Sequence, residues 1–120
     1  CETIEPTLLD RTVSEEASRA LASLLEGVVA DGSGSRAYIE GYKVGGKTGT
    51  AQKFEDGSIA QGKYVSSFLG FFPSDDPQYL VLVIVDEPQG AYYGSVVAAP
   101  AAREVMQGII DVRGIRPYES

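Results

Sequence analysis

Two segments of the chain carry apolar residues at the three- and four-residue spacing of an amphipathic helix. The first stripe consists of Ala17, Leu21, Leu24, Leu25 and Val28. Ser14 precedes it as a candidate N-cap, and we expect this helix to end near Asp31-Gly32. The second stripe consists of Ala102, Val105, Met106, Ile109 and Ile110, and Pro100 suits its first turn. The pattern predicts one helix near each end of the chain, the first preceded by an extended arm at residues 1–13.

Between the predicted helices the pattern changes to short segments bounded by glycine, proline and acidic residues. We expect strands around 42–51, at 64–72 and at 79–85, separated by a turn-rich excursion at 54–63 and a turn at 74–77. The third segment is apolar throughout, which predicts a strand covered on both faces. The last two strands are close enough for a hairpin, so the sheet should be antiparallel. The predicted fold class is α+β, with about three antiparallel strands flanked by helices.

The composition narrows the chemistry that this chain can perform. Of its 120 residues 43% are hydrophobic, and its net charge of −7 disfavours binding to nucleic acid. The chain has no His, which excludes a Ser-His-Asp triad, and a single Cys, which excludes an intrachain disulfide and a multi-cysteine zinc site. No apolar run approaches the ~20 residues of a membrane span, so we expect a soluble chain. We predict no cofactor and no metal, and a passive role for Cys1.

Residues 41–48 match the phosphate-loop pattern Gly-x-x-x-x-Gly-Lys-Thr. Such a loop requires a helix directly after the lysine, because the first N–H groups of that helix bind the phosphates. Two Gly and two Thr within ten residues of Lys47 make a poor first helix. Residues 64–85 also leave no room for the crossover helix of a parallel sheet. A nucleotide-binding protein is therefore the least favoured hypothesis.

The same residues can instead form a strand that contains Lys47-Thr48-Gly49-Thr50. Side chains alternate along a strand, so Thr48 and Thr50 would share one face. Their hydroxyl donors, with an ammonium nearby, would suit a carboxylate, and Gly49 would let a ligand approach the backbone. The triplet alone does not establish a site, because such triplets occur by chance in many strands.

The longer context of this strand resembles the class B penicillin-binding proteins, the transpeptidases of division and sporulation. The resemblance is carried by residues 27–53, Gly62-Lys63-Tyr64-Val65-Ser66-Ser67-Phe68-Leu69-Gly70-Phe71, Asp86-Glu87-Pro88, Tyr92-Tyr93-Gly94 and Val97-Ala98-Ala99-Pro100. It extends from about residue 3 to residue 117. One departure is Ser33, where the family more often has Thr between two glycines.

The resemblance implies that the parent protein cross-links peptidoglycan stem peptides through an acyl-serine intermediate, and that β-lactams acylate the same serine. By resemblance Lys47 supplies positive charge, Thr48, Gly49 and Thr50 bind the D-Ala-D-Ala end, and the Thr50 backbone N–H donates into the oxyanion hole. Division or sporulation proteins are further candidate partners. The parent would act on the outer side of the bacterial cell membrane, anchored by an N-terminal helix.

Only one of the family's three active-site motifs occurs in this sequence. No Ser is followed three positions later by Lys, and the chain has no Asn for a Ser-x-Asn motif. We therefore expect residues 1–120 to be the C-terminal portion of a transpeptidase domain, with the serine β-lactamase/transpeptidase-like fold, that is inactive alone and forms no penicillin adduct. The alternative is a non-catalytic peptide-binding module of the same fold.

The resemblance also implies a five-stranded sheet, two strands of which would come from outside this chain. The strand at 79–85 would then have an open edge. We expect either self-association through that edge or the arm at 1–13 folded over the gap.

Two further pairs of residues each allow two interpretations. Tyr92 and Tyr93 either line a substrate cleft or fold onto the core, and the second is favoured. Asp86 and Glu87 either form an acid–base pair or end a strand in solvent, and again the second is favoured.

Overall fold

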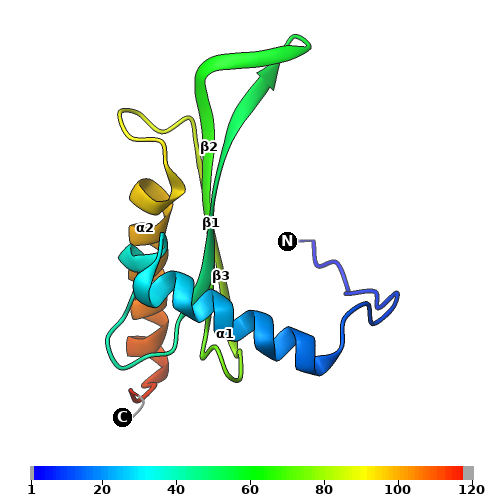
Figure 1. The fold of residues 1–120 in the computed structure, drawn as a ribbon, viewed down its shortest axis with the longest axis vertical. Coiled ribbons are helices and arrows are strands. Elements are labelled where there is room, and N and C mark those ends of the chain that lie inside the picture. The colour runs from blue at the N-terminus through cyan, green and yellow to red at the C-terminus, as the bar shows by residue number, and fades with distance from the viewer. Residues whose placement is uncertain (1, 118–120) are drawn as a thin grey trace.

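Two long helices and three strands make up the described part of the chain, residues 2–117, in a computed structural model (Figure 1). The elements in chain order are α1 (Glu15–Asp31), a 3-10 turn η1 (Ser35–Ala37), β1 (Gly45–Glu55), β2 (Ser58–Phe72), β3 (Tyr79–Asp86) and α2 (Gly94–Arg113). The strands form one antiparallel sheet in the order β1-β2-β3. This arrangement confirms the predicted α+β class. Cys1 lies outside the described residues.

Helix α1 begins and ends where the sequence predicts, but its apolar stripe is not buried as expected. The Ser14 side chain caps the helix by accepting a hydrogen bond from the Ala17 N–H at 3.1 Å. Leu21 and Leu24 are 55% and 70% exposed, and Val29 is the buried residue of the helix. Only the C-terminal end of α1 reaches the core, while its N-terminal end projects past the sheet (Figure 1). The Ser14 cap therefore sets where the helix begins. The described residues do not cover the whole apolar stripe of α1.

Strands β1 and β2 form a longer hairpin than the sequence predicts. The strands run to Glu55 and resume at Ser58, so the predicted excursion at 54–63 is wrong. Asp56 and Gly57 make the turn with positive φ angles of 52° and 80°. Two successive positive φ angles match the right-handed twist of the flanking strands, and Asp-Gly favours them. The hairpin tip projects beyond both helices (Figure 1).

Strand β3 is covered on one face, so the prediction of a strand covered on both faces is wrong for the described residues. Val81 is 7% exposed, whereas Leu80, Leu82 and Ile84 are 69%, 58% and 60% exposed. The odd-numbered residues of β3 belong to the core beneath α2. A continuous apolar run thus predicts burial without showing which part of a protein supplies the cover.

The core lies between α2 and the sheet. Its largest buried side chains include Phe68 and Phe72 of β2 and Met106 of α2. Gly46 of β1 permits this packing, because a Cβ atom there would lie 2.5 Å from Cζ of Phe68 and 2.7 Å from the Leu69 carbonyl oxygen. The close packing of the Phe68 ring against β1 therefore depends on the absence of a side chain at Gly46.

Helix α2 begins at Gly94, so the expectation that Pro100 lies in the first turn is wrong. The Tyr93 carbonyl accepts hydrogen bonds from the N–H groups of Val96 and Val97 at 2.9 and 3.1 Å. The first turn is therefore complete before Pro100. Gly114, with a φ of 63°, ends the helix in the left-handed conformation that favours glycine.

The arm at residues 2–13 has no regular structure and does not cover β3. Its apolar residues Ile4, Leu8 and Leu9 are 86%, 91% and 91% exposed. The alternative in which the arm folds over the open edge is therefore wrong for the described residues, since these side chains make too few contacts to offset the cost of ordering the chain. Self-association stays a prediction. No helix within residues 2–117 has the length and apolar character needed to cross a membrane.

Candidate functional site

The Lys47-Thr48-Gly49-Thr50 segment lies in β1, an edge strand of the described sheet. Strand β2 pairs with it in a register that places Thr50 opposite Ser66. The strand continues to Glu55, so no helix follows Lys47 and the phosphate-loop hypothesis is wrong. Among the described residues, the edge of β1 away from β2 has no strand partner.

The two threonines lie on the face of the sheet that α2 covers. In the register of the hairpin, Thr48 is opposite Phe68 and Thr50 is opposite Ser66, and both β2 residues are fully buried. Thr48 is half-buried, whereas Thr50 is exposed. The predicted alternation thus places both hydroxyls on one face, at the border between the core and solvent.

Lys47 leaves the strand on the other face, because it is adjacent to Thr48 in an alternating strand. Its side chain is exposed, and its Nζ donates a hydrogen bond to the Thr48 carbonyl oxygen at 2.8 Å. The sequence suggested that the ammonium and the two hydroxyls line one surface. In the structure the Lys47 side chain lies on the opposite face of the strand from the two hydroxyls. The ammonium is instead bound to the backbone of β1 through the Thr48 carbonyl oxygen.

The Thr50 hydroxyl contacts the first residue of α2. Its Oγ1 accepts a hydrogen bond from the Gly94 N–H at 2.9 Å. A threonine hydroxyl has one proton and two lone pairs, so this hydroxyl retains its proton for donation to a ligand. In the sequence, Gly94 belongs to the Tyr92-Tyr93-Gly94 segment that resembles the penicillin-binding proteins. No periodicity in the sequence indicates that Gly94 contacts Thr50.

The tyrosines near Gly94 fold partly onto the sheet. Tyr92 stacks on Tyr64 of β2 with the ring centroids 4.1 Å apart, while Tyr93 is 57% exposed. Hydrogen bonding to Tyr93 raises the pKa of Tyr92. The favoured expectation, folding onto the core, therefore describes Tyr92 better than Tyr93.

Asp86 and Glu87 both contact a lysine that sequence reasoning missed. Lys53 Nζ lies 3.1 Å from Oδ1 of Asp86 and 3.0 Å from Oε1 of Glu87. Hydrogen bonds to Glu87 and then to Asp86 raise the pKa of Lys53. The two carboxylates therefore end the strand as expected, but they are ion-paired. Only the hairpin brings Lys53 to the end of β3, so its position in the sequence gave no signal.

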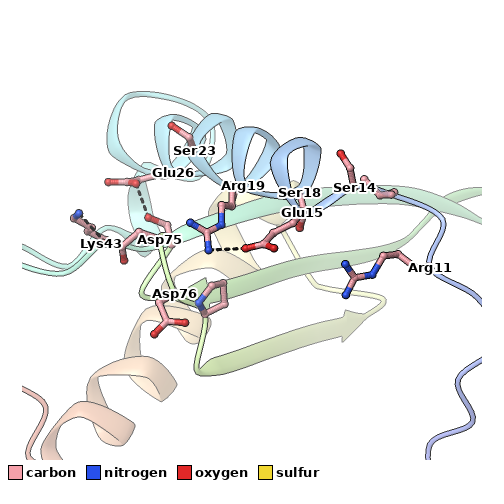
Figure 2. A pocket seen from close by; sticks show the side chains of 14 residues that line it. Arg11, Ser14, Glu15, Ser18, Arg19, Ser23, Glu26, Lys43, Asp75 and Asp76 are labelled. Carbon is pink, nitrogen blue, oxygen red and sulfur yellow. Dashed lines mark hydrogen bonds and ion pairs between the residues drawn. The ribbon is translucent and has the colours of Figure 1, made fainter.

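A hollow of about 690 Å³ lies elsewhere, between the arm, α1 and the turn after β2 (Figure 2). Its labelled charged residues are of both signs: Arg11, Arg19, Lys43, Glu15, Glu26, Asp75 and Asp76. Ion pairs join Arg19 to Glu15 at 2.7 Å and Lys43 to Asp75 at 3.1 Å. This mixed lining does not favour a ligand of one charge, and Lys47 to Thr50 take no part in it. Over residues 2–117 no cluster of three His, Cys, Asp or Glu side chains could hold a metal ion.

Comparisons with known proteins agree on one family. The family model for the penicillin binding protein transpeptidase domain matches residues 3–107. Stage V sporulation protein D of Bacillus subtilis is 44% identical over 116 residues, which are 96% of this chain and 18% of that protein. The peptidoglycan D,D-transpeptidase FtsI homolog of Chlorokybus atmophyticus is 39% identical over 109 residues, 89% of this chain and 16% of that protein.

The fold comparison gives the same answer. The apo TP domain of penicillin-binding protein 3 from Burkholderia pseudomallei superposes with a TM-score of 0.81 and 32% identity, over 97% of this chain and 36% of that chain. The chain spans less than a fifth of the length of the two curated relatives. The similarity thus covers nearly all of this chain and a small part of each relative.

Proposed function

Because this chain belongs to the transpeptidase-domain family of the penicillin-binding proteins, we propose that it supplies the Lys-Thr-Gly strand of a serine-type peptidoglycan D,D-transpeptidase. In this proposal residues 1–120 form the C-terminal portion of the domain. The parent protein acts on the outer face of the bacterial cell membrane. It cross-links stem peptides through an acyl-serine and is acylated by β-lactams.

The observation that carries the proposal is the position of Lys47-Thr48-Gly49-Thr50 on an exposed edge strand. An extended peptide can approach such an edge and pair with its backbone. The Thr48 and Thr50 hydroxyls would donate to the terminal carboxylate of a D-Ala-D-Ala peptide or to the carboxylate of a β-lactam. Gly49 would keep the approach to the strand open.

Two further roles belong to the same strand. The Lys47 ammonium would supply positive charge beside the serine of the Ser-x-Asn motif. The backbone N–H of Thr50 would donate to the oxyanion of the tetrahedral intermediate, a contact worth ~3 kcal/mol of barrier in enzymes of this kind. These roles need a serine nucleophile with its base, and this sequence has neither Ser-x-x-Lys nor Ser-x-Asn. Loss of a nucleophile reduces kcat on the order of a millionfold, so we expect no turnover by the 120 residues alone.

The test is a hybrid in which these residues replace the matching segment of the Burkholderia pseudomallei domain, a domain named for penicillin binding. We expect the folded hybrid to form a covalent adduct with a fluorescent penicillin, and the isolated chain to form none by mass spectrometry. Thr50→Val should slow labelling of the hybrid roughly tenfold or more, because a hydrogen bond to a charged group is lost.

Gly108→Ala is the matched control, since a Cβ atom at Gly108 meets nothing within 4 Å. A hybrid that melts cooperatively but stays unlabelled would contradict the proposal. If the isolated chain then binds D-Ala-D-Ala reversibly, the non-catalytic peptide-binding module becomes the better description.

A further inference from the structure

The first residue of α2 sits directly on the backbone of the Lys-Thr-Gly strand. A Cβ atom on Gly94 would lie 2.6 Å from the carbonyl oxygens of both Gly49 and Ser67, and 3.2 Å from the Gly49 nitrogen. Gly94 is buried, and the atoms it meets belong to the backbone, which cannot move aside as a flexible side chain can. The absence of a side chain at Gly94 is therefore a condition for α2 to reach β1.

This close approach gives two facing hydroxyls opposite roles. Thr50 and Ser66 are a cross-strand pair beneath the start of α2. The Ser66 hydroxyl donates its proton to the Tyr92 carbonyl oxygen, whereas the Thr50 hydroxyl accepts from the Gly94 N–H at 2.9 Å. Ser66 is fully buried, and Thr50 is exposed. The Ser66 proton is thus used in a hydrogen bond to the loop before α2, whereas the Thr50 proton stays available for solvent or a ligand.

The Gly94 N–H would otherwise lack a partner within its own helix. The first four N–H groups of a helix have no intrahelical acceptor, and a hydroxyl oxygen is a suitable substitute. Because this N–H can only donate, the Thr50 oxygen can only accept from it. While this contact is present, the Thr50 hydroxyl cannot direct its own proton toward α2.

We infer that Gly94 is a positioning residue that makes the Thr50 hydroxyl a donor toward the carboxylate of a bound ligand. The inference rests on the proposed function, since it deepens the role given to Thr50. It predicts selectivity: an acceptor-only carboxylate is bound, and the carboxamide of the same peptide is bound less well.

The first experiment measures the contact itself and needs no ligand. In the 120-residue chain labelled with ¹⁵N, the Gly94 amide should be protected from hydrogen exchange. Thr50→Val should accelerate its exchange at least tenfold, while Thr50→Ser, which keeps the hydroxyl, should not. Equal exchange in the Val and Ser variants would overturn the inference and would leave the proposed function standing.

The second experiment measures selectivity. N-acetyl-D-Ala-D-Ala and its C-terminal carboxamide are titrated into the hybrid domain, and the ratio of the two dissociation constants is compared among its variants. Gly94→Ala and Thr50→Val should each reduce the preference for the carboxylate roughly tenfold. Gly108→Ala, in an open position of the same helix, should leave it unchanged.

A double variant separates positioning from a general structural effect. If Gly94 acts through Thr50, Gly94→Ala combined with Thr50→Val should lose no more selectivity than Thr50→Val alone. Additive losses, or a folded Gly94→Ala variant with full selectivity, would overturn the inference. A folded hybrid that binds neither peptide, although the 120-residue chain protects its Gly94 amide through Thr50, would contradict the proposed function and not the contact.

Discussion

Both faces of β3 carry apolar side chains, yet one face is covered by α2 and the other is open. Under α2, Phe68, Val81 and Met106 are at most 7% exposed. On the opposite face of β3, Leu82 and Ile84 are 58% and 60% exposed, and most of the α1 stripe is uncovered as well. Apolar periodicity therefore predicts that a face needs to be covered, whereas only the tertiary structure shows where the cover lies.

Truncation of one large side chain on each face should give the strongest contrast in stability. Phe68→Ala should lower the free energy of unfolding by about 3–5 kcal/mol, because it leaves a cavity in the closed core. Leu82→Ala on the open face should change it by less than about 1 kcal/mol, because most of that side chain is already in water. Urea unfolding of both variants at the same protein concentration measures the contrast. Equal losses would show that the open face is covered in solution, as self-association would cover it.

A pair of glycines should give effects of opposite sign. Gly46→Ala should destabilise the chain by about 1–3 kcal/mol, because the new Cβ atom meets Phe68 and the backbone of Leu69. Gly27→Ala in α1 should stabilise it by up to about 1 kcal/mol, since nothing lies within 4 Å and alanine favours a helix. Thermal unfolding of the two variants checks the signs. A stabilised Gly46→Ala variant would contradict the close packing beneath α2.

The cap of α1 tests how far that helix depends on local interactions. Ser14→Ala removes the side chain that accepts from the Ala17 N–H, and should cost about 1 kcal/mol of unfolding free energy. Ser23→Ala, at an exposed position within the same helix, is the control and should be close to neutral. Circular dichroism during urea unfolding reports both. No difference between the two variants would mean that packing, rather than capping, sets the start of α1.

The weakest of these contributions should come from the ion pairs of Lys53 at the end of β3. The carboxylates of Glu87 and Asp86 raise the pKa of Lys53 above 10.5 in the folded chain. Its contribution to stability is therefore fully present below pH 10.5 and is lost as the pH rises through the folded-state value. The difference in Tm between the wild type and Lys53→Met should be constant from pH 7 to 9 and should shrink above pH 10.5. It should also shrink in 1 M salt, and a difference that grows with pH would refute the assignment.

The sequence predicted those features of the site and fold that depend on neighbours along the chain. The start of α1 follows from the hydroxyl of Ser14, and the strand at Lys47 to Thr50 follows from residues that cannot begin a helix. The turn-rich excursion predicted at 54–63 is confined to Asp56 and Gly57, because these two residues suffice to join two extended strands. The family was also evident from the sequence, because its motifs are contiguous segments.

The class of fold, the ends of the first helix and the placement of the Lys-Thr-Gly segment on a strand all follow from the sequence without the structure. Each of these depends on capping, turn or alternation rules that act over a few residues. Three other features depend on the tertiary structure: β3 is open on one face, Lys53 contacts Asp86 and Glu87, and the Gly94 N–H donates to Thr50. The contacts of Lys53 and Gly94 join residues more than thirty positions apart. They arise from the register of the hairpin and from the position of α2 on the sheet, which no local pattern specifies.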